Sequence, residues 1–262
     1  MLSYPRSGLC RTALAGAMSL AALVSPAAAD EADARTILAA MSDYLTKQQS
    51  FAFDYDATLE VITTEDQRIA LASSGTAAVE RPNHIHATRR GGFTNVEMGF
   101  DGSTFTLVGH DADIYTQIEA PGTIENLIDT LRSEYGIVLP AADLLIADPE
   151  KVLMDGVTDV KDLGVGVIGG TDCDHIALRR EDVDVQIWVA QGAAPYPCRY
   201  VLSARKVAEQ PQYSVQISNW TTDVSADALE VGIPDGATKV DVDDLAKSFR
   251  ELPENFTTGD AQ

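Results

Sequence analysis

Apolar and polar residues alternate along much of the chain, and this alternation predicts β-strands. Over residues 51–61 every odd position is apolar, while the even positions include Asp54, Asp56, Thr58 and Glu60. A period of two places one set of side chains on a dry face and the other on a wet face of a sheet. Weaker alternation or short apolar runs predict further strands at residues 69–79, 84–89, 95–100, 104–108, 114–119, 157–168, 174–180, 183–189, 199–206 and 213–220.

Two segments have instead the spacing of amphipathic helices, residues 33–47 and residues 124–135. In the second segment the apolar positions fall on one helix face, and Gly136 then ends the pattern. Shorter helical segments are predicted at residues 140–146, 149–154 and 243–250.

These elements predict a mainly β protein with helices, an α+β fold in which the helices are inserted midway along one antiparallel sheet. The chain has no internal repeat and no low-complexity linker, so residues 30–240 are predicted to form a single domain. The last segment, residues 241–262, is polar and acidic, and we expect a poorly ordered tail there.

The N-terminus has the features of a cleaved export signal. Arg6 and Arg11 precede an uncharged apolar stretch over residues 13–24, and small residues lead up to Ala29. This order predicts a signal peptide over residues 1–29 that is cleaved after Ala29 and directs the chain to the periplasm. The alternative is a short N-terminal anchor that is retained.

The remainder of the chain is predicted to be soluble. Cys10 precedes the apolar stretch instead of following the cleavage point, so a lipid anchor on a cysteine is not expected. The body of the chain contains no apolar run of 18 residues that could span a bilayer. With 19 Lys and Arg against 40 Asp and Glu, the net charge of −21 repels phosphate backbones, and nucleic acid is not an expected partner.

Two cysteines remain after cleavage, Cys173 and Cys198. An even pair in an oxidising compartment favours a disulfide. The predicted strand at 183–189 separates the two cysteines, however, and neighbouring strands lie about 4.8 Å apart. A bridge therefore requires that this middle strand end before Gln191, and the alternative is a pair of buried thiols.

One glycine motif matches a dinucleotide fingerprint in spacing, with Gly164, Gly166 and Gly169. That fingerprint needs a helix directly after the glycines, so that the helix N-terminus meets the pyrophosphate. Here residues 171–174 are polar and begin another strand. We therefore interpret the motif as a glycine-rich hairpin and expect no cofactor.

Metal and catalytic motifs are weak. His84 and His86 share one strand face, as two metal ligands could, but no third ligand follows at a suitable spacing, and both are predicted to face solvent. Acidic clusters at residues 110–113 and 172–175 lack the closing Glu of a calcium loop and are interpreted as turns. No nucleophile elbow, zinc-binding helix or phosphate loop is present, so neither a metal site nor an enzyme is predicted.

Three sequence blocks, in order, resemble a family of predicted bacterial periplasmic proteins that is itself similar to the lipoprotein carriers LolA and LolB. The resemblance covers residues 33–240. The blocks are Pro121-Gly122-Thr123-Ile124 with Tyr135-Gly136-Ile137-x-Leu139-Pro140-x-Ala142-Asp143-Leu144-Leu145; Asp174-His175-Ile176-Ala177-Leu178-Arg179 with Val183-Asp184-x-Gln186-Ile187-Trp188 and Pro195-x-Pro197-x-Arg199-Tyr200; and Pro211-Gln212-Tyr213 with Trp220.

The resemblance implies an incomplete antiparallel β-barrel, a half-barrel closed by helices over a hydrophobic cavity. In such carriers the cavity takes acyl chains without covalent chemistry. This sequence departs from LolB because it lacks the lipid-anchor cysteine. The arginine that latches the lid in LolA has no assigned counterpart here.

On this basis we expect a periplasmic carrier or sensor, not an enzyme, that binds a lipid, a lipoprotein acyl chain or another hydrophobic ligand. A strongly curved sheet under helices can leave such a cavity. Its lining is predicted to come from the first strand, the fourth strand and the inserted helices, with Phe51, Phe53, Tyr55, Leu59, Met98, Phe100, Leu127, Leu131, Leu144 and Leu145.

The alternative is a structural or protein-interaction module of the cell envelope, whose half-barrel is filled by its own side chains. In that case Ser73, Gly75 and Ala77 on the second strand would admit a partner strand from an envelope protein.

Overall fold

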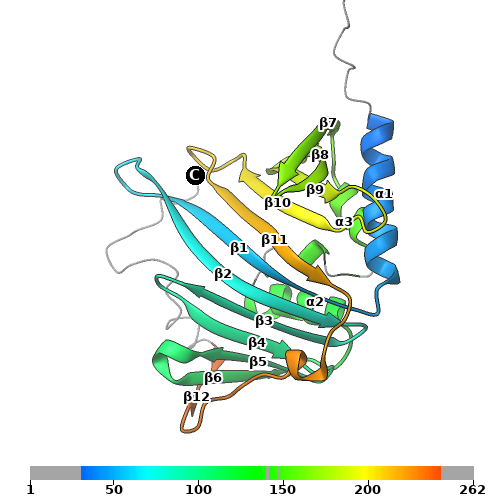
Figure 1. Cartoon of the computed structure of the whole chain (residues 1–262). Coiled ribbons are helices and arrows are strands. Elements are labelled where there is room, and N and C mark those ends of the chain that lie inside the picture. Colours follow the sequence, from blue (N-terminus) through cyan, green and yellow to red (C-terminus); the bar gives the residue numbers. More distant parts are fainter. Residues whose placement is uncertain (1–30, 138, 140–141, 145, 147, 243–262) are drawn as a thin grey trace, which may run out of the picture.

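The computed structural model of the 262-residue chain describes residues 31–137, 139, 142–144, 146 and 148–242. Within them, twelve strands form one sheet (Figure 1). The strands are β1 (Ser50–Ile62), β2 (Arg68–Glu80), β3 (His84–Gly91), β4 (Asn95–Phe100), β5 (Thr104–Gly109), β6 (Ile114–Glu119), β7 (Asp159–Ile168), β8 (Thr171–Arg179), β9 (Val183–Ala190), β10 (Pro197–Ala204), β11 (Gln212–Thr221) and β12 (Thr238–Lys239).

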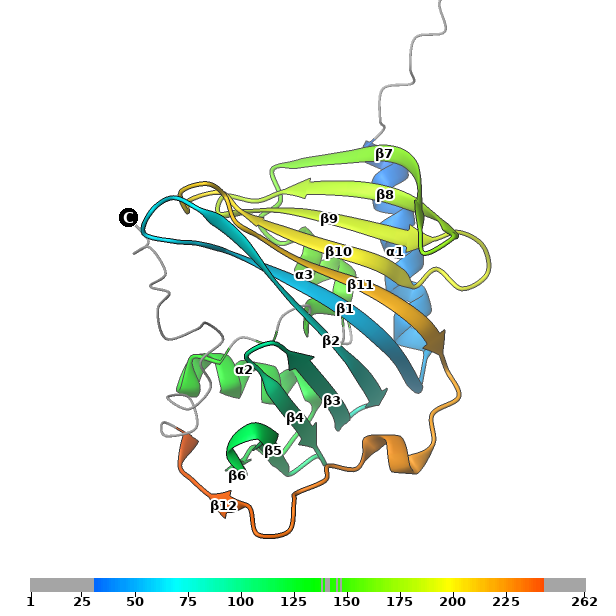
Figure 2. The same cartoon turned by 60° about the vertical axis from the view of Figure 1, so that its left-hand side comes forward.

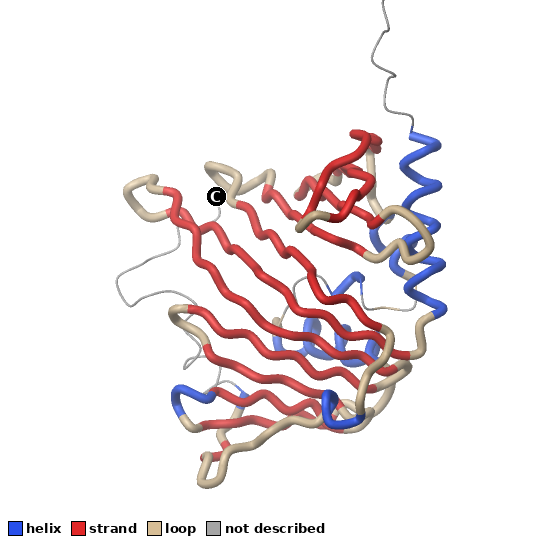
Figure 3. The backbone as a smooth tube through the Cα atoms, in the orientation of Figure 1, coloured by secondary structure: helices blue, strands red, loops and turns tan. Residues whose placement is uncertain are grey.

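The sheet consists of two meanders that meet at the pairing of β1 with β11. Its order is β12-β6-β5-β4-β3-β2-β1-β11-β10-β9-β8-β7, and every neighbouring pair is antiparallel except β12 with β6. In the described chain β7 and β12 lie at opposite edges and do not pair with each other, so the sheet is open. Its strands turn progressively from one edge to the other, which gives a strongly curved surface (Figures 2 and 3).

Among the described residues, three α-helices accompany the sheet: α1 (Glu31–Lys47), α2 (Ile124–Tyr135) and α3 (Pro149–Met154). Short 3₁₀ turns lie at η1 (His110–Ala112), η2 (Ala142–Leu144) and η3 (Ala226–Leu229). The α2 helix begins at a capping box between Thr123 and Asn126 and ends at Gly136, which is left-handed with φ 65°. Four residues of its apolar face, Ile124, Leu127, Ile128 and Leu131, are buried.

The helices pack on the inner face of the sheet and form two buried clusters there. The first joins α1 and α3 to strands β7–β10, with Leu38, Met41 and Leu45 of α1 at its centre. The second joins α2 to β1–β6, through Leu127 and Leu131. Trp220 at the end of β11 contacts both clusters and so lies between the two halves of the core.

The predicted strands correspond to β1–β11, with ends that shift by a few residues, and the sheet confirms a mainly β fold. Of the helical segment predicted at 140–146, the structure describes residues 142–144, which form the 3₁₀ turn η2, and residue 146; residues 140, 141 and 145 lie outside the described residues. The structure adds η1, η3 and β12, which the sequence pattern did not indicate. The signal peptide, the helix at 243–250 and most of the tail lie outside the described residues, so these remain predictions.

The glycine motif forms a hairpin between β7 and β8, as interpreted from the sequence. Gly169 and Gly170 make the turn with φ of 57° and 89°, and the next residues continue directly as β8. The motif is followed by strand β8 and not by a helix, so it lacks the strand–turn–helix arrangement of the dinucleotide fingerprint.

A disulfide joins Cys173 and Cys198, whose Cα atoms are 7.0 Å apart. Cys173 on β8 lies opposite Ala190, which is the last residue of the intervening strand β9. A register shift between Pro197 and Arg199 on β10 sets Cys198 at the same end. The middle strand thus ends before Gln191, which is the condition that the bridge requires.

Candidate ligand-binding cavity

A cavity of about 370 Å³ lies on the inner face of the sheet. Pockets of 300–1,000 Å³ with mainly apolar walls are typical of small-molecule sites. The wall residues come from β1–β5, β10 and β11, the β3–β4 turn, α1 and the chain between α2 and α3. They are Leu45, Phe51, Phe53, Tyr55, Ala77, Ile85, Ala87, Thr88, Arg89, Phe93, Thr94, Val96, Met98, Leu107, Leu139, Leu144, Pro197, Tyr200, Tyr213, Val215, Ile217 and Trp220.

The central strands carry small side chains where they line the cavity. The register places Phe53 of β1 opposite Ala77 of β2, and Ala77 opposite Ala87 of β3. One row further along, Tyr55 lies opposite Gly75. Aromatic side chains on β1 therefore stand beside alanines and a glycine on the neighbouring strands, which leaves space above the sheet.

Trp220 forms the aromatic wall at one end. Its ring stacks on Phe51 at 4.9 Å, on Phe53 at 5.7 Å and on Tyr196 at 5.2 Å between ring centroids. Its indole Nε1 donates a hydrogen bond of 3.1 Å to the hydroxyl of Tyr44 on α1. Stacked and hydrogen-bonded in this way, the indole is held in one orientation against the cavity.

The middle of the cavity has a hydroxyl group that is fixed to the sheet. Tyr55 donates a hydrogen bond of 2.7 Å from its hydroxyl to the backbone carbonyl of Thr88 on β3. Burial first, and then the nearby Tyr213, raise the pKa of Tyr55 to about 12, while the charge of Arg89 opposes this shift. The hydroxyl consequently stays protonated and keeps its role as a donor.

The cavity becomes more polar towards the β3–β4 turn. Arg89 lines it there and donates from Nε to the hydroxyl of Ser73, 3.2 Å away. Phe93 in the turn lines the cavity yet is 50% exposed, which places it where the cavity meets solvent. The cavity thus runs from an aromatic end at Trp220 to an end that carries a charge.

The helical side of the cavity is formed by leucines. Leu45 at the end of α1, Leu139 after α2 and Leu144 in η2 all line it. Figures 1 and 2 show α2 and α3 on one side of the curved sheet, and these leucines belong to that layer or adjoin it.

Of the predicted lining residues, the structure brings five to the cavity: Phe51, Phe53, Tyr55, Met98 and Leu144. Their role in binding a ligand stays a prediction. Leu145 lies outside the described residues.

Four predicted residues lie elsewhere. Phe100, Leu127 and Leu131 are at most 3% exposed and belong to the buried core around α2. They do not reach the cavity, because the apolar face of α2 packs against β3–β6. Leu59 shares the inner face of β1, but it lies opposite Leu71 and Tyr213 towards the far end of the strand and is not part of the wall.

The lining residues that the sequence did not indicate come from most elements around the cavity, and β3 and β11 contribute four each. Tyr213, Val215 and Ile217 alternate along β11, and this signal was visible in the sequence. The alternation along β11 did not predict that Trp220 faces the cavity, because a β-bulge interrupts the alternation just before it. Between Ala52–Asp54 of β1 and Ser218–Thr221 of β11 the register gains one residue, at Asn219 with φ 52°. The bulge brings an even-numbered residue to the odd-numbered face.

The small residues of β2 do not form an open edge. This strand pairs with both β1 and β3, so Ser73, Gly75 and Ala77 lie inside the sheet. They accommodate inner-face side chains, with Gly75 beneath Tyr55, instead of a strand from another protein. That part of the interaction hypothesis is wrong.

His86 is not a solvent-facing residue, in contrast to the prediction. Its Nε2 lies 2.9 Å from one oxygen of Glu97, and Nε2 of His110 lies 2.9 Å from the other. The backbone N–H of Gly232 donates to the same carboxylate at 2.8 Å. The segment at 225–232 therefore covers this part of the outer face. His84 contacts Asn83 instead.

Burial alone would raise the pKa of Glu97. The N–H of Gly232 and the imidazoles of His86 and His110 outweigh that effect and hold the pKa of this carboxyl below its ordinary value. Across the described chain no group of three His, Cys, Asp or Glu side chains is arranged to hold a metal ion. We interpret this cluster as a structural contact that fastens the C-terminal segment to the sheet.

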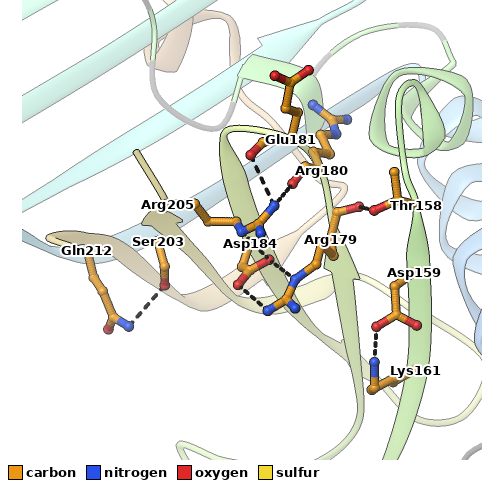
Figure 4. Close-up of polar contacts among 10 residues, drawn as sticks. All are labelled: Thr158, Asp159, Lys161, Arg179, Arg180, Glu181, Asp184, Ser203, Arg205 and Gln212. Atoms are coloured by element: carbon orange, nitrogen blue, oxygen red, sulfur yellow. Dashed lines mark hydrogen bonds and ion pairs between the residues drawn. The ribbon is translucent and has the colours of Figure 1, made fainter. Parts of the chain in front are cut away.

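Charged residues elsewhere link neighbouring strands and turns of the sheet, as Figure 4 shows for the region of β8, β9 and β10. Arg179 donates two hydrogen bonds of 2.8 Å to the carboxylate of Asp184, which lowers the pKa of that carboxyl. Arg205 donates to the backbone carbonyls of Arg180 and Glu181. These contacts lie apart from the cavity wall.

The described chain therefore combines a curved, almost entirely antiparallel sheet, helices on one face of it and an apolar cavity between the two. The chain belongs to the family described as "Predicted periplasmic protein (DUF2092)", whose model matches residues 34–243. This match confirms the predicted periplasmic location and the family resemblance. No curated protein sequence matches the chain. Among the helices of the described chain, none combines the length and apolar character needed to cross a membrane.

Several solved structures are similar to this chain. The lipoprotein LppX of Mycobacterium tuberculosis is 15% identical over 76% of this chain and 100% of its own, with a TM-score of 0.45. A chain of the Pseudomonas aeruginosa MucA/MucB complex is 14% identical over 76% of this chain and 61% of its own length, with a TM-score of 0.45. A LolA superfamily protein from Nitrosomonas europaea is 10% identical over 76% of this chain and 97% of its own length, with a TM-score of 0.34. These likenesses assign no ligand to this chain.

Proposed function

We propose that this protein is a periplasmic carrier or binding protein that holds a lipid, a lipoprotein acyl chain or another hydrophobic ligand without covalent chemistry. The observation that carries the proposal is the cavity of about 370 Å³, whose wall is formed largely by aliphatic and aromatic side chains. Burial of each CH₂ group of an acyl chain contributes about 0.8 kcal/mol, so such a wall alone can hold a chain.

In this proposal the helical layer closes the half-barrel. Leu45, Leu139 and Leu144 oppose the sheet across the cavity and would cover a bound chain. Leu139 and Leu144 belong to the chain between α2 and α3, and Leu45 to the end of α1.

Binding of the neutral fluorescent probe Nile red to a matched pair of variants tests the proposal. Ala77→Leu fills the cavity floor, and Ala70→Leu makes the same change at an exposed position of the same strand. We expect Ala77→Leu to weaken probe binding about tenfold or more, since each displaced CH₂ contact is worth about 0.8 kcal/mol. Absence of probe binding to the wild-type protein, or equal binding by both variants, would refute the proposal.

A second candidate function, an interaction module of the cell envelope, is favoured by the edge strand β7. Leu163, Val165 and Val167 are 49–64% exposed there. Edge strands with apolar side chains are suited to pairing with a strand of another protein. Crosslinking in cells distinguishes the two functions: a stoichiometric protein partner on β7 with no lipid in the purified protein favours this candidate.

A further inference from the structure

One row of side chains crosses five strands of the sheet along the cavity. Residues paired across neighbouring antiparallel strands lie directly opposite each other on the same face of a sheet. Followed from β1 to β5, the register gives a continuous row, and each of its members lines the cavity: Phe53, Ala77, Ala87, Met98 and Leu107. We call these five residues the cavity row. Their side chains carry no charge and no N–H or O–H group, so they match a hydrocarbon and not a polar group.

The next row on one side of the cavity row is filled by the protein's own core. Its members are at most 3% exposed and belong to the buried cluster around α2: Phe51, Val79, Ile85, Phe100 and Phe105. Two of them, Phe51 and Ile85, also border the cavity. Side chains two residues apart on a strand are separated by about 6.6 Å, so this packed row forms a wall directly beside the cavity row. A ligand cannot spread to that side without displacing the core.

The ring of Tyr55 borders the cavity row on its other side. Its hydroxyl is bonded to the backbone carbonyl of Thr88 on β3, so the ring reaches from β1 across β2, where Gly75 leaves room for it. The same hydrogen bond fixes the ring in place. A channel one row wide therefore crosses β1, β2 and β3 between the ring of Tyr55 and the packed core.

The dimensions of this channel match one hydrocarbon chain. Four strand spacings of about 4.8 Å separate Phe53 on β1 from Leu107 on β5, about 19 Å in all. A fully extended chain of single bonds advances about 1.2 Å per bond, so about 16 carbons span that length. The cavity volume of about 370 Å³ gives a second figure, because it holds about 12 methylene groups if each takes the volume of a water molecule in the liquid, about 30 Å³.

Resting on the proposed function, we infer that the ligand is a single-chain lipid, whose one chain of about 12–16 carbons lies across β1–β5 along the cavity row. The polar end of such a lipid lies outside the cavity row, because these five side chains offer it neither a charge nor a hydrogen-bond donor. A lipid with two or three long chains exceeds the channel, since each further chain needs a similar volume of its own.

Isothermal titration calorimetry with alkylphosphocholines, from octyl to octadecyl and each below the concentration at which it forms micelles, tests this inference. We expect the affinity of the wild-type protein to rise about fourfold with each added methylene group. The rise should end at about 12–16 carbons, where the channel is full. A gain that continues unchanged to the octadecyl compound would overturn the inferred capacity and leave the hydrophobic carrier intact. Binding of none of these compounds would overturn both.

A matched pair of variants tests where the chain lies. Leu107→Trp places an indole at the β5 end of the cavity row and should shorten it, so that hexadecylphosphocholine binds about tenfold or more weakly while octylphosphocholine binds as before. Leu163→Trp makes the same change on β7, where the leucine is 49% exposed, and should behave as wild type. Retained octyl binding shows that Leu107→Trp is folded. Unchanged hexadecyl binding in Leu107→Trp would contradict the inferred position of the chain.

A lipid with two chains tests the single-chain assignment. Didecanoyl phosphatidylcholine and decylphosphocholine share a headgroup and a chain length, and we expect their affinities to agree within about tenfold. Burial of the second chain would instead raise the affinity by about a thousandfold or more, at about fourfold per methylene group. Such a gain would overturn the single-chain assignment, although the cavity would still hold a hydrophobic ligand.

Discussion

The hydroxyl of Tyr55 on β1 donates a hydrogen bond to the backbone carbonyl of Thr88 on β3, across the width of the intervening strand. This contact is possible because Gly75 lies between them: a Cβ atom there would stand 1.9 Å from the Thr88 oxygen. The ladder between β2 and β3 also lacks direct pairing between Ser74 and Ala77. A local gap in the sheet is thus occupied by an aromatic ring that lines the cavity.

Gly75→Ala should destabilise the protein, because the added methyl group collides with backbone and with the Tyr55 ring. Overpacking of this kind costs about 1–3 kcal/mol. Tyr55→Phe should cost about 1 kcal/mol through loss of one hydrogen bond. Urea denaturation measures both changes. Gly92→Ala is the control, because its Cβ would meet nothing within 4 Å. If Gly75→Ala were no less stable than Gly92→Ala, the account of this contact would be wrong.

The contact of Glu97 with Gly232, His86 and His110 should make stability depend on pH. Because the pKa of Glu97 is lowered in the folded state, its carboxylate stabilises the fold above the ordinary value of about 4.3. That stabilisation is lost as the pH falls through the lowered pKa. Glu97→Gln is therefore expected to be about 1–3 kcal/mol less stable than wild type at pH 7, with a gap that closes in acid.

Urea midpoints of wild type and Glu97→Gln, measured from pH 7 down to pH values below the ordinary carboxyl range, check this expectation. Glu65→Gln, in an exposed turn, is the control and should track wild type throughout. A gap that stays constant with pH would show that the effect of Glu97→Gln comes from packing instead of charge.

The disulfide between Cys173 and Cys198 should stabilise the end of the sheet at which β8 and β10 are linked. It closes a loop with a sequence separation of 25, for which loop entropy gives about 3–4 kcal/mol. We expect the double Cys→Ser variant to melt several degrees lower, at about 2–4 °C per kcal/mol. Thiol counting on denatured, unreduced protein exported to the periplasm is the direct check, and two free thiols would contradict the bridge.

Local sequence patterns predicted the parts of the fold that depend on nearest neighbours. The alternation over residues 51–61 correctly placed Phe51, Phe53 and Tyr55 on the inner face, and the spacing of α2 correctly located its apolar face. The same spacing could not tell a buried helix face from a cavity wall. Leu127 and Leu131 therefore proved to be core residues instead of lining.

The rest of the cavity depends on long-range pairing and on irregular backbone. The pairing of β1 with β11 joins two strands that are far apart in the sequence, and no local pattern indicates it. The bulge at Asn219 turns Trp220 inwards against the alternation. Arg89 carries no local signal either, because its position at the polar end of the cavity follows from the register of three strands.

The central claim, that the cavity holds a hydrophobic ligand, is tested most directly by native mass spectrometry of protein purified from a bacterial periplasm, followed by solvent extraction. We expect a bound species of lipid mass that is extracted from wild-type protein and from Ala70→Leu, and that is depleted in Ala77→Leu. Protein that carries no lipid, and that takes up none when lipid is added, would show that the cavity does not hold a hydrophobic ligand.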